Sequence, residues 1–192
     1  GGCMKVLIIG SGGREHVLAW KISQSPLLTK LYAAPGNAGI AQVAECVAIE
    51  AEDIQGLLSL AKREAIDLTI VGPEAPLVAG ITDVFEKEGL KVFGPSKHAA
   101  MLEGSKSFSK DQMAKFGIPT ADYEVFTNVN EAKHFCIESE MPMVIKADGL
   151  AAGKGVVICD NTQDAVAALT KMMAEGVFGD AGKKVVIEKK LE

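Results

Sequence analysis

Apolar runs alternate with amphipathic segments along the first half of the chain. The run at residues 4–9 predicts a strand that is covered on both faces, because an apolar run of this length leaves no polar side for solvent. A glycine turn and an amphipathic helix follow, with Val17, Leu18 and Ile22 at helical spacing. The alternation continues as strands at 30–34, 67–72 and 90–94 and helices at 54–64 and 77–89. Such alternation predicts a parallel, doubly wound α/β sheet over residues 4–95.

The rhythm changes after Pro95. Two helical pieces broken at Gly104 are expected, then a strand at 122–127 and a helix at 128–139 capped by Asn130. Two strands at 142–148 and 155–160 flank a glycine-rich turn and predict an antiparallel hairpin. A helix opened by Asn161 and a strand at 183–189 complete the pattern. We therefore expect an N-terminal α/β domain (4–104), a helical connector (105–122) and a small α+β domain (123–192), with residues 1–3 a cloning remnant.

Composition excludes several classes of protein. The chain has 192 residues, 48% of them hydrophobic, and a net charge of -5, which disfavours a nucleic-acid-binding surface. No apolar run approaches the ~20 residues that cross a bilayer, so no membrane partner is expected. The four cysteines form no CxxC pair, which disfavours a zinc site or a disulfide framework and favours buried free thiols in the cytoplasm.

The segment GSGGREH (10–16) directly follows the first strand. A glycine turn at a helix start presents backbone N–H groups that suit a phosphate, and Arg14 has a guanidinium that can grip one. The dinucleotide fingerprint fails because Glu15 stands where its last glycine is needed. The alternative is that Gly10, Gly12 and Gly13 only let the strand and the helix pack closely.

Two further turns are expected at the same edge of the sheet. APGNAG (34–39) and VGPEAP (71–76) follow later parallel strands, whose carboxyl ends meet where α/β proteins bind ligands. Asn37, Pro73 and Glu74 are therefore candidate ligand contacts. A rigid turn with a solvated acid is the alternative for Pro73 and Glu74.

A second candidate site surrounds KADGLAAGKGV (146–156). It is not a Walker loop, because the spacing of Gly149 and Gly153 is too short and Gly155 stands where a hydroxyl should follow Lys154. Lys146 instead leaves a buried strand beside these glycines, where backbone amides and an ammonium suit a polyphosphate. A flexible hairpin turn is the alternative.

In this order, GGREH, APGNAG, DLTIVGPEAPL, FGP, LEGSK, VIKADGLAAGKGV and FGDAG resemble the phosphoribosylamine–glycine ligase family, also called glycinamide ribonucleotide synthetases, of the ATP-grasp superfamily. The resemblance implies an ATP- and magnesium-dependent ligase of purine biosynthesis. Such an enzyme joins glycine to 5-phosphoribosylamine through glycyl phosphate and gives glycinamide ribonucleotide, ADP and phosphate.

The resemblance also implies roles for the two candidate sites. Residues 123–192 correspond to the lid domain over ATP, and the ATP-binding candidates are Lys106, Lys146, Gly149, Gly153, Lys154, Gly155 and Glu188. The candidates for binding the ribose phosphate are Gly10, Gly12, Gly13, Arg14, Glu15, Asn37, Pro73 and Glu74. No catalytic residue and no metal ligand is assigned.

Two departures from the family pattern affect the expectations. Lys189 and Lys190 replace the acid and the aromatic that usually follow Glu188, which bears on the hinge to adenine. The family is considerably longer, so the magnesium ligands are expected beyond residue 192, and the chain alone is expected to be inactive. The alternative function is a noncatalytic module that binds nucleotides or sugar phosphates.

Overall fold

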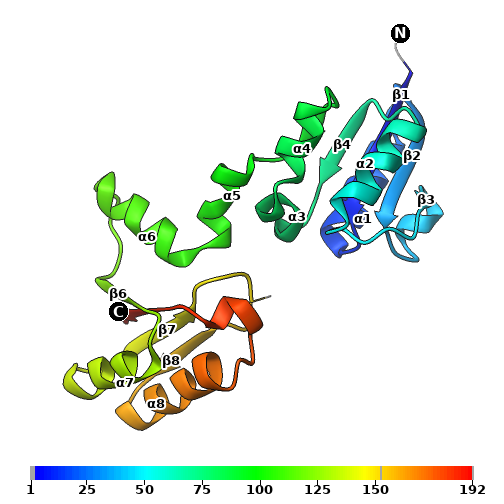
Figure 1. Ribbon diagram of the computed structural model, residues 1–192. Coiled ribbons are helices and arrows are strands. Elements are labelled where there is room, and N and C mark those ends of the chain that lie inside the picture. Colours follow the sequence, from blue (N-terminus) through cyan, green and yellow to red (C-terminus); the bar gives the residue numbers. More distant parts are fainter. Residues whose placement is uncertain (1–2, 152, 192) are drawn as a thin grey trace. The chain divides into compact units, whose positions relative to one another are not determined.

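The computed structural model describes residues 3–151 and 153–191, so Gly1 and Gly2 of the expected cloning remnant, and Glu192, lie outside the described residues. The chain divides into two compact units, Gly1–Ala100 and Met101–Glu192. Each unit has its own sheet and its own apolar core (Figure 1).

The N-terminal unit is built on a parallel sheet with the strand order β3-β2-β1-β4-β5, as the alternating pattern predicts. Its strands are β1 (Met4–Gly10), β2 (Leu28–Pro35), β3 (Glu45–Cys46), β4 (Leu68–Val71) and β5 (Val92–Phe93). Its helices are α1 (Gly13–Ser23), the 3-10 turn η1 (Ile40–Gln42), α2 (Ile54–Arg63), α3 (Glu74–Ala79) and α4 (Ile81–Lys87). The helix α5 (Lys97–Gly104) crosses the boundary between the units.

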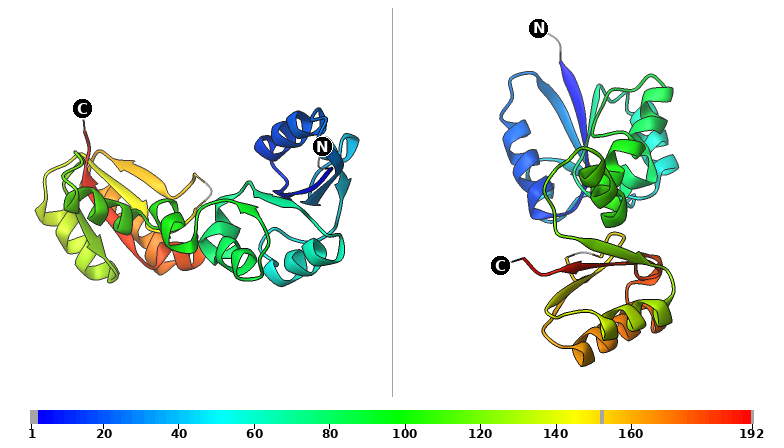
Figure 2. Two further views of the ribbon diagram at one scale, coloured as in Figure 1. Left: turned by 90° about the horizontal axis from the view of Figure 1, so that it is seen from above. Right: turned by 90° about the vertical axis from the view of Figure 1, so that its left-hand side faces the viewer.

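Helices cover both faces of this sheet (Figure 2). Leu7 and Ile9 of β1 pack in one core with α2 and α4, whereas Val6 and Ile8 pack in the other with α1. Because successive side chains of a strand point to opposite faces, a strand covered in this way must be apolar at almost every position. This explains the run at residues 4–9.

Three local features of the N-terminal unit were not predicted from the sequence. The helix expected at 77–89 begins at Glu74 and is split into α3 and α4 at Gly80, whose φ of 99° lies in the left-handed region. Val17, one of the three apolar residues noted at helical spacing in α1, is 63% exposed. The edge strand β3 was not expected, since two residues are too few to show a periodicity.

The C-terminal unit holds an antiparallel sheet with the order β6-β9-β7-β8. Its strands are β6 (Tyr123–Phe126), β7 (Met143–Ala147), β8 (Val156–Cys159) and β9 (Val185–Lys189). Its helices are α6 (Lys106–Lys115), α7 (Val129–Glu138) and α8 (Thr162–Leu169), followed by a π-helical turn η2 (Thr170–Ala174) and a 3-10 turn η3 (Gly179–Gly182). The predicted hairpin of β7 and β8 around the glycine loop is present.

One face of this sheet is covered by α7 and α8, which Figure 1 shows side by side. Met143, Ile145 and Ala147 of β7 face these helices in the core. Lys146 alternates with them and lies on the other face. Glu188 lies on this same face, because it pairs with Val144, two residues before Lys146.

The expectations for two helix caps of this unit, and for the cysteines of the whole sequence, had different outcomes. Asn161 caps α8 by accepting the N–H of Asp164, as predicted, but α7 is capped by Asn128 and not by Asn130. The expectation of buried thiols is correct only in part. Cys136 and Cys159 are buried, whereas Cys3 and Cys46 are exposed.

Candidate functional site

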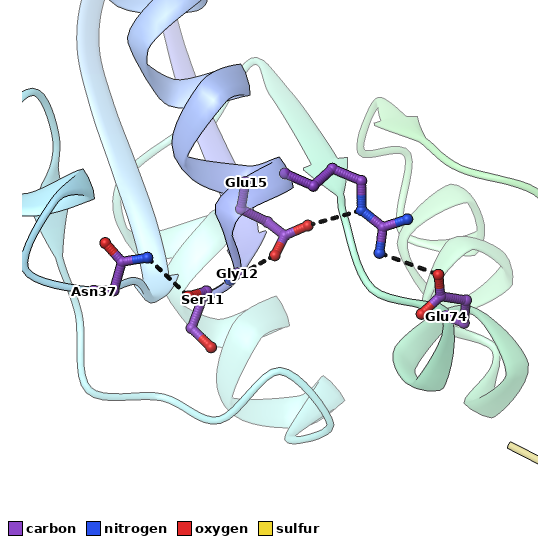
Figure 3. A network of polar contacts seen from close by, with 6 residues as sticks. Ser11, Gly12, Glu15, Asn37 and Glu74 are labelled. Carbon is purple, nitrogen blue, oxygen red and sulfur yellow. Dashed lines mark hydrogen bonds and ion pairs between the residues drawn. The ribbon is translucent and has the colours of Figure 1, made fainter. Parts of the chain in front are cut away.

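The first candidate site lies where β1 ends and α1 begins. Gly12 is the N-cap residue of α1, and the Oε2 atom of Glu15 accepts its backbone N–H at 2.7 Å (Figure 3). A carboxylate at the start of a helix is stabilised by the unpaired N–H groups and the positive end of the helix dipole. Part of the anion-binding capacity of this turn is therefore used by the chain's own Glu15.

The burial of Glu15 explains the glycines around it. Its side chain is 5% exposed. A Cβ atom at Gly10 would lie 2.7 Å from the Cγ atom of Glu15, and a Cβ atom at Gly72 would lie 2.2 Å from its Oε1 atom. At Gly12 a Cβ atom would lie 2.8 Å from its Oε2 atom. Glycine at these three positions makes room for a carboxylate, a reason that neither of the two sequence interpretations contained.

Arg14 bridges two carboxylates. Its Nε atom lies 3.2 Å from Glu15 Oε1, and its Nη2 atom lies 3.1 Å from Glu74 Oε1 (Figure 3). Hydrogen bonds to Glu74 and then to Glu15 raise the pKa of Arg14. The backbone N–H of Glu74 itself and the Arg14 guanidinium outweigh burial and lower the pKa of Glu74. The side chain of Arg14 is 59% exposed, so the guanidinium is held in place and still open to solvent.

Asn37 connects the turn after β2 to the glycine turn. Its Nδ2 atom donates to the backbone oxygen of Ser11 at 2.8 Å (Figure 3). Its Oδ1 atom accepts the N–H of Ile40 at 2.9 Å. Pro73 and Glu74 stand at the N-terminus of α3, so they open a helix and do not form the isolated turn that was expected. The eight N-terminal site candidates thus gather at the C-terminal ends of three neighbouring strands, β2, β1 and β4.

The second candidate site lies on the C-terminal unit, around the end of β7. Lys146 of β7 forms an ion pair with Glu188 of β9. Lys106 is the first residue of α6, and its Nζ atom donates to the backbone oxygen of Gly149 at 3.1 Å. Burial lowers the pKa of Lys106, Asp148 opposes this effect, and the charge of Lys146 adds to it. The two lysines that were predicted to meet ATP therefore both lie beside the start of the glycine loop.

Asp148 connects several residues of this site through hydrogen bonds and an ion pair, although the sequence analysis did not single it out. It is 6% exposed, and its carboxylate accepts the Ser107 N–H at 2.5 Å, the Ser105 hydroxyl at 3.0 Å and the Lys184 ammonium at 2.9 Å. Its backbone oxygen also accepts the N–H of Lys106 at 3.0 Å. Asp148 thus holds the N-terminus of α6 against the start of the glycine loop.

The glycines of the loop have different structural roles. A Cβ atom at Gly149 would lie 2.9 Å from the Cβ of Ala181, and one at Gly155 would lie 2.6 Å from the Cβ of Ala151. Gly153 has a φ of 76° and open space around it. Two of these glycines therefore allow close packing, while the third allows the turn. Lys154 beside it is exposed.

A further residue that sequence reasoning missed is Lys110. It comes one helical turn after Lys106 on α6 and forms an ion pair with Glu188. The spacing of four residues was the available signal, because it places both lysines on one side of a helix. Among the described residues, no group of three or more His, Cys, Asp or Glu side chains is placed to hold a metal ion.

Comparison with known proteins decides the family. The N domain of phosphoribosylglycinamide synthetase matches residues 4–103, and the ATP-grasp (A) domain of the same synthetase matches residues 104–192. The chain belongs to the phosphoribosylamine–glycine ligase family. The ligase of Halalkalibacterium halodurans is 56% identical over 189 residues, and that of Escherichia coli K12 is 56% identical over 191 residues. Each alignment covers 98% of this chain and 44% of the relative, so the chain spans less than half the length of these ligases.

Solved structures agree with this assignment. The crystal structure of phosphoribosylamine–glycine ligase from Thermotoga maritima has a TM-score of 0.76 at 32% identity and covers 98% of this chain and 44% of that one. A biotin carboxylase domain from Hydrogenobacter thermophilus has a TM-score of 0.80 at 20% identity, covering 100% of this chain and 45% of that one, a likeness of fold alone. In the part of the chain that the structure describes, no helix has the length and apolarity that crossing a membrane requires.

Proposed function

We propose that this chain forms the ribose-phosphate-binding unit and the ATP lid of a phosphoribosylamine–glycine ligase. The ligase would join glycine to 5-phosphoribosylamine at the expense of ATP, through glycyl phosphate, in the cytoplasm. The observation that carries the proposal is that Lys106 and Lys146 both lie beside the start of the glycine loop, in a chain 56% identical to such ligases.

The chemistry of this arrangement suits a polyphosphate. Two ammonium groups held near each other repel, and the burial of one of them makes its charge more costly. A ligand with several negative charges would relieve both costs, whereas a neutral ligand would relieve neither. The resident acids Asp148 and Glu188 already have lysine partners, which supports a role in fixing the site and not in filling it. Gly149, Gly153, Lys154 and Gly155 would close over the phosphates.

The same face of the sheet offers a surface for the base. Val156 and Ile158 of β8 pair with Lys146 and Val144 and point to the side away from α7 and α8. They are 46% and 56% exposed, so apolar surface adjoins the proposed phosphate-binding lysine. A flat aromatic base would remove this apolar surface from water. We assign no magnesium ligand on this chain.

The N-terminal unit is proposed to bind the phosphate and ribose of 5-phosphoribosylamine. Arg14 would contact the phosphate, because its guanidinium is exposed although two carboxylates orient it. The N–H groups at the start of α1 would add hydrogen bonds. Glu15 would orient Arg14, Glu74 would approach the ribose, and Asn37 would fix the turn that carries Ser11.

The proposed reaction needs an activated carboxylate. A carboxylate is a poor electrophile. Transfer of the γ-phosphoryl group of ATP to the carboxylate of glycine would give an acyl phosphate, which has a good leaving group. The lysines would neutralise phosphoryl charge and position the phosphates, which is the main contribution of proteins to phosphoryl transfer. Arg14 would hold the second substrate by its phosphate, away from the bond that forms.

Calorimetry on the 192-residue chain tests this proposal. We expect MgATP, MgADP and ribose 5-phosphate each to bind. Lys146→Gln should weaken only nucleotide binding, by about tenfold or more, a change of ~1.4 kcal/mol or more. The matched control is Lys171→Gln, which removes an exposed lysine of η2. Binding of the sugar phosphate with no binding of nucleotide would favour the noncatalytic module instead.

A further inference from the structure

The carboxylate of Glu188 lies between two lysines from different elements. Lys110 of α6 pairs with one oxygen and Lys146 of β7 with the other. The Glu188 side chain is 7% exposed, that of Lys110 is 11% exposed and that of Lys146 is 26% exposed. A buried carboxylate is thus neutralised by one buried lysine and by one that reaches solvent.

Lys110 is held from several sides. Its Nζ atom donates to Thr120 Oγ1 at 2.6 Å and to the backbone oxygen of Ala121 at 3.3 Å, and it forms an ion pair with Glu188. The same atom lies 5.5 Å from the centroid of the Tyr123 ring. Two hydrogen bonds, an ion pair and the face of an aromatic ring therefore surround this ammonium group. Lys110 therefore has little to gain from a new partner.

Lys146 differs in this respect. Within residues 3–151 and 153–191, Glu188 is the one recorded partner of its ammonium group, which leaves two N–H donors for another acceptor. Lys146 is also the more exposed of the two lysines and stands at the root of the glycine loop. Of the two lysines paired with Glu188, Lys146 is therefore the one whose ammonium group can leave the carboxylate and bind a phosphate.

Removing the last counter-charge from a buried carboxylate is costly, because an unpaired buried charge loses its hydration without compensation. We propose that Lys110 is a positioning residue of the ATP site, which keeps Glu188 neutralised so that the Lys146 ammonium can turn from Glu188 to a phosphate. This proposal rests on the proposed function in that it takes Lys146 as the phosphate ligand. Lys110 itself contacts no nucleotide.

The ionisation of Glu188 gives the proposal a measurable signature. Burial alone would raise the pKa of Glu188, but Lys110 and then Lys146 outweigh it, so that the pKa lies below its ordinary value. The titratable groups around the carboxylate are Lys110 of α6, Lys146 of β7 and Tyr123 of β6, whose hydroxyl is bound to Asp111 of α6. Removing Lys110 deletes a charge that lowers this pKa, so the pKa of Glu188 should rise.

The first experiment needs no nucleotide. Carbon NMR titration of the Glu188 carboxyl in the 192-residue chain follows its ionisation, with the resonance assigned through Glu188→Gln. We expect Glu188 to stay ionised at neutral pH in Lys146→Met, because Lys110 remains. In the double variant with Lys110→Met, its pKa should rise above the ordinary value. A protonated Glu188 at neutral pH in Lys146→Met would overturn the proposal.

The second experiment adds MgATP. At pH 7.5, Lys110→Met should bind MgATP about tenfold more weakly than the unsubstituted chain, a loss of ~1.4 kcal/mol of binding free energy. The reason is that Glu188 then keeps its ion pair with Lys146. Below the Glu188 pKa that the NMR titration of this variant measures, the difference should shrink, because protonation of Glu188 releases Lys146. The control is Lys115→Met, at the last residue of the same helix, which should bind as the unsubstituted chain does at both pH values.

The outcomes separate the two proposals. An equal loss of affinity at both pH values would assign Lys110 a purely structural role and overturn the inference. Equal binding by Lys110→Met and the unsubstituted chain would also overturn it and leave the ATP site intact. If the unsubstituted chain bound no MgATP, the proposed function itself would fail.

Discussion

The Oδ1 atom of Asp148 accepts a hydrogen bond from the backbone N–H of Ser107 at 2.5 Å. This contact places a carboxylate at the N-terminus of α6, where the helix dipole stabilises it. It also fixes the position of Lys106, the first residue of that helix, relative to the end of β7.

Replacement of Asp148 should destabilise the C-terminal unit. In Asp148→Ala, the Ser107 N–H, the Ser105 hydroxyl and the Lys184 ammonium lose their acceptor, and we expect the free energy of unfolding to fall by ~3 kcal/mol. Hydrogen exchange of the β7 and β9 amides, measured as urea unfolds the chain, gives this loss. The control Asp160→Ala removes an exposed acid, 3.8 Å from its lysine partner, and should cost at most ~0.5 kcal/mol. Equal losses in the two variants would contradict the role of Asp148.

The same carboxylate makes stability depend on pH. Burial alone would raise the pKa of Asp148, but the Ser107 N–H, Lys184 and Ser105 outweigh it and lower that pKa below its ordinary value. A carboxyl with a lowered folded pKa contributes stability above its unfolded value, and this stability is lost as pH falls through the folded value. We therefore expect the C-terminal unit to lose stability below about pH 4. The loss should be smaller in Asp148→Asn, and an identical acid profile would contradict the assignment.

A tyrosine in the same unit should titrate late. The Tyr123 hydroxyl donates to Asp111 Oδ1 at 2.6 Å, and this hydrogen bond, together with burial, raises the pKa of Tyr123 to about 12. Absorbance near 295 nm follows the ionisation of Tyr123 and of Tyr32, the other tyrosine of the chain. Asp111→Asn should lower the pKa of Tyr123 and leave that of Tyr32 unchanged. A late titration that survives Asp111→Asn would show that burial alone is responsible.

The glycines near Glu15 should tolerate alanine selectively. A Cβ atom at Gly72 would displace the buried carboxylate of Glu15, so Gly72→Ala should cost ~2 kcal/mol. Fluorescence of Trp20, the one tryptophan of the chain, follows urea unfolding of this unit. Gly13→Ala is the matched control: apart from its chain neighbours and the backbone of its own helix, no atom lies within 4 Å of its Cβ position, and we expect a change within ~1 kcal/mol. Adding Glu15→Ala should cancel most of the effect of Gly72→Ala; independent effects of the two substitutions would contradict this explanation.

Much of the fold could be predicted from the sequence, because it depends on local patterns. The run at residues 4–9 predicts β1, and the glycines between two apolar runs predict the hairpin of β7 and β8. The motif GSGGREH and the turns that carry Asn37 and Glu74 were correctly expected at one edge of the parallel sheet. Whether they bind a ribose phosphate stays a prediction, as do the roles of the ATP candidates and the exact domain boundaries.

What could not be predicted depends on contacts between residues distant in the sequence. Glu15 is buried against Gly72. Lys110 pairs with Glu188 because β9, which carries Glu188, lies between β6 and β7 in the sheet. Even the local choice between Asn128 and Asn130 as the cap of α7 depends on backbone angles, since Asn128 alone precedes the first helical residue. Periodicity contains none of this information.

The two outer strands of the parallel sheet, β3 and β5, are each only two residues long. A strand edge presents unpaired backbone N–H and C=O groups on which another polypeptide can form a cross-molecular β-ladder. Such short edges offer too few of these groups for a stable ladder, whichever molecule approaches. The central strands can therefore be almost wholly apolar without the sheet becoming a template for aggregation.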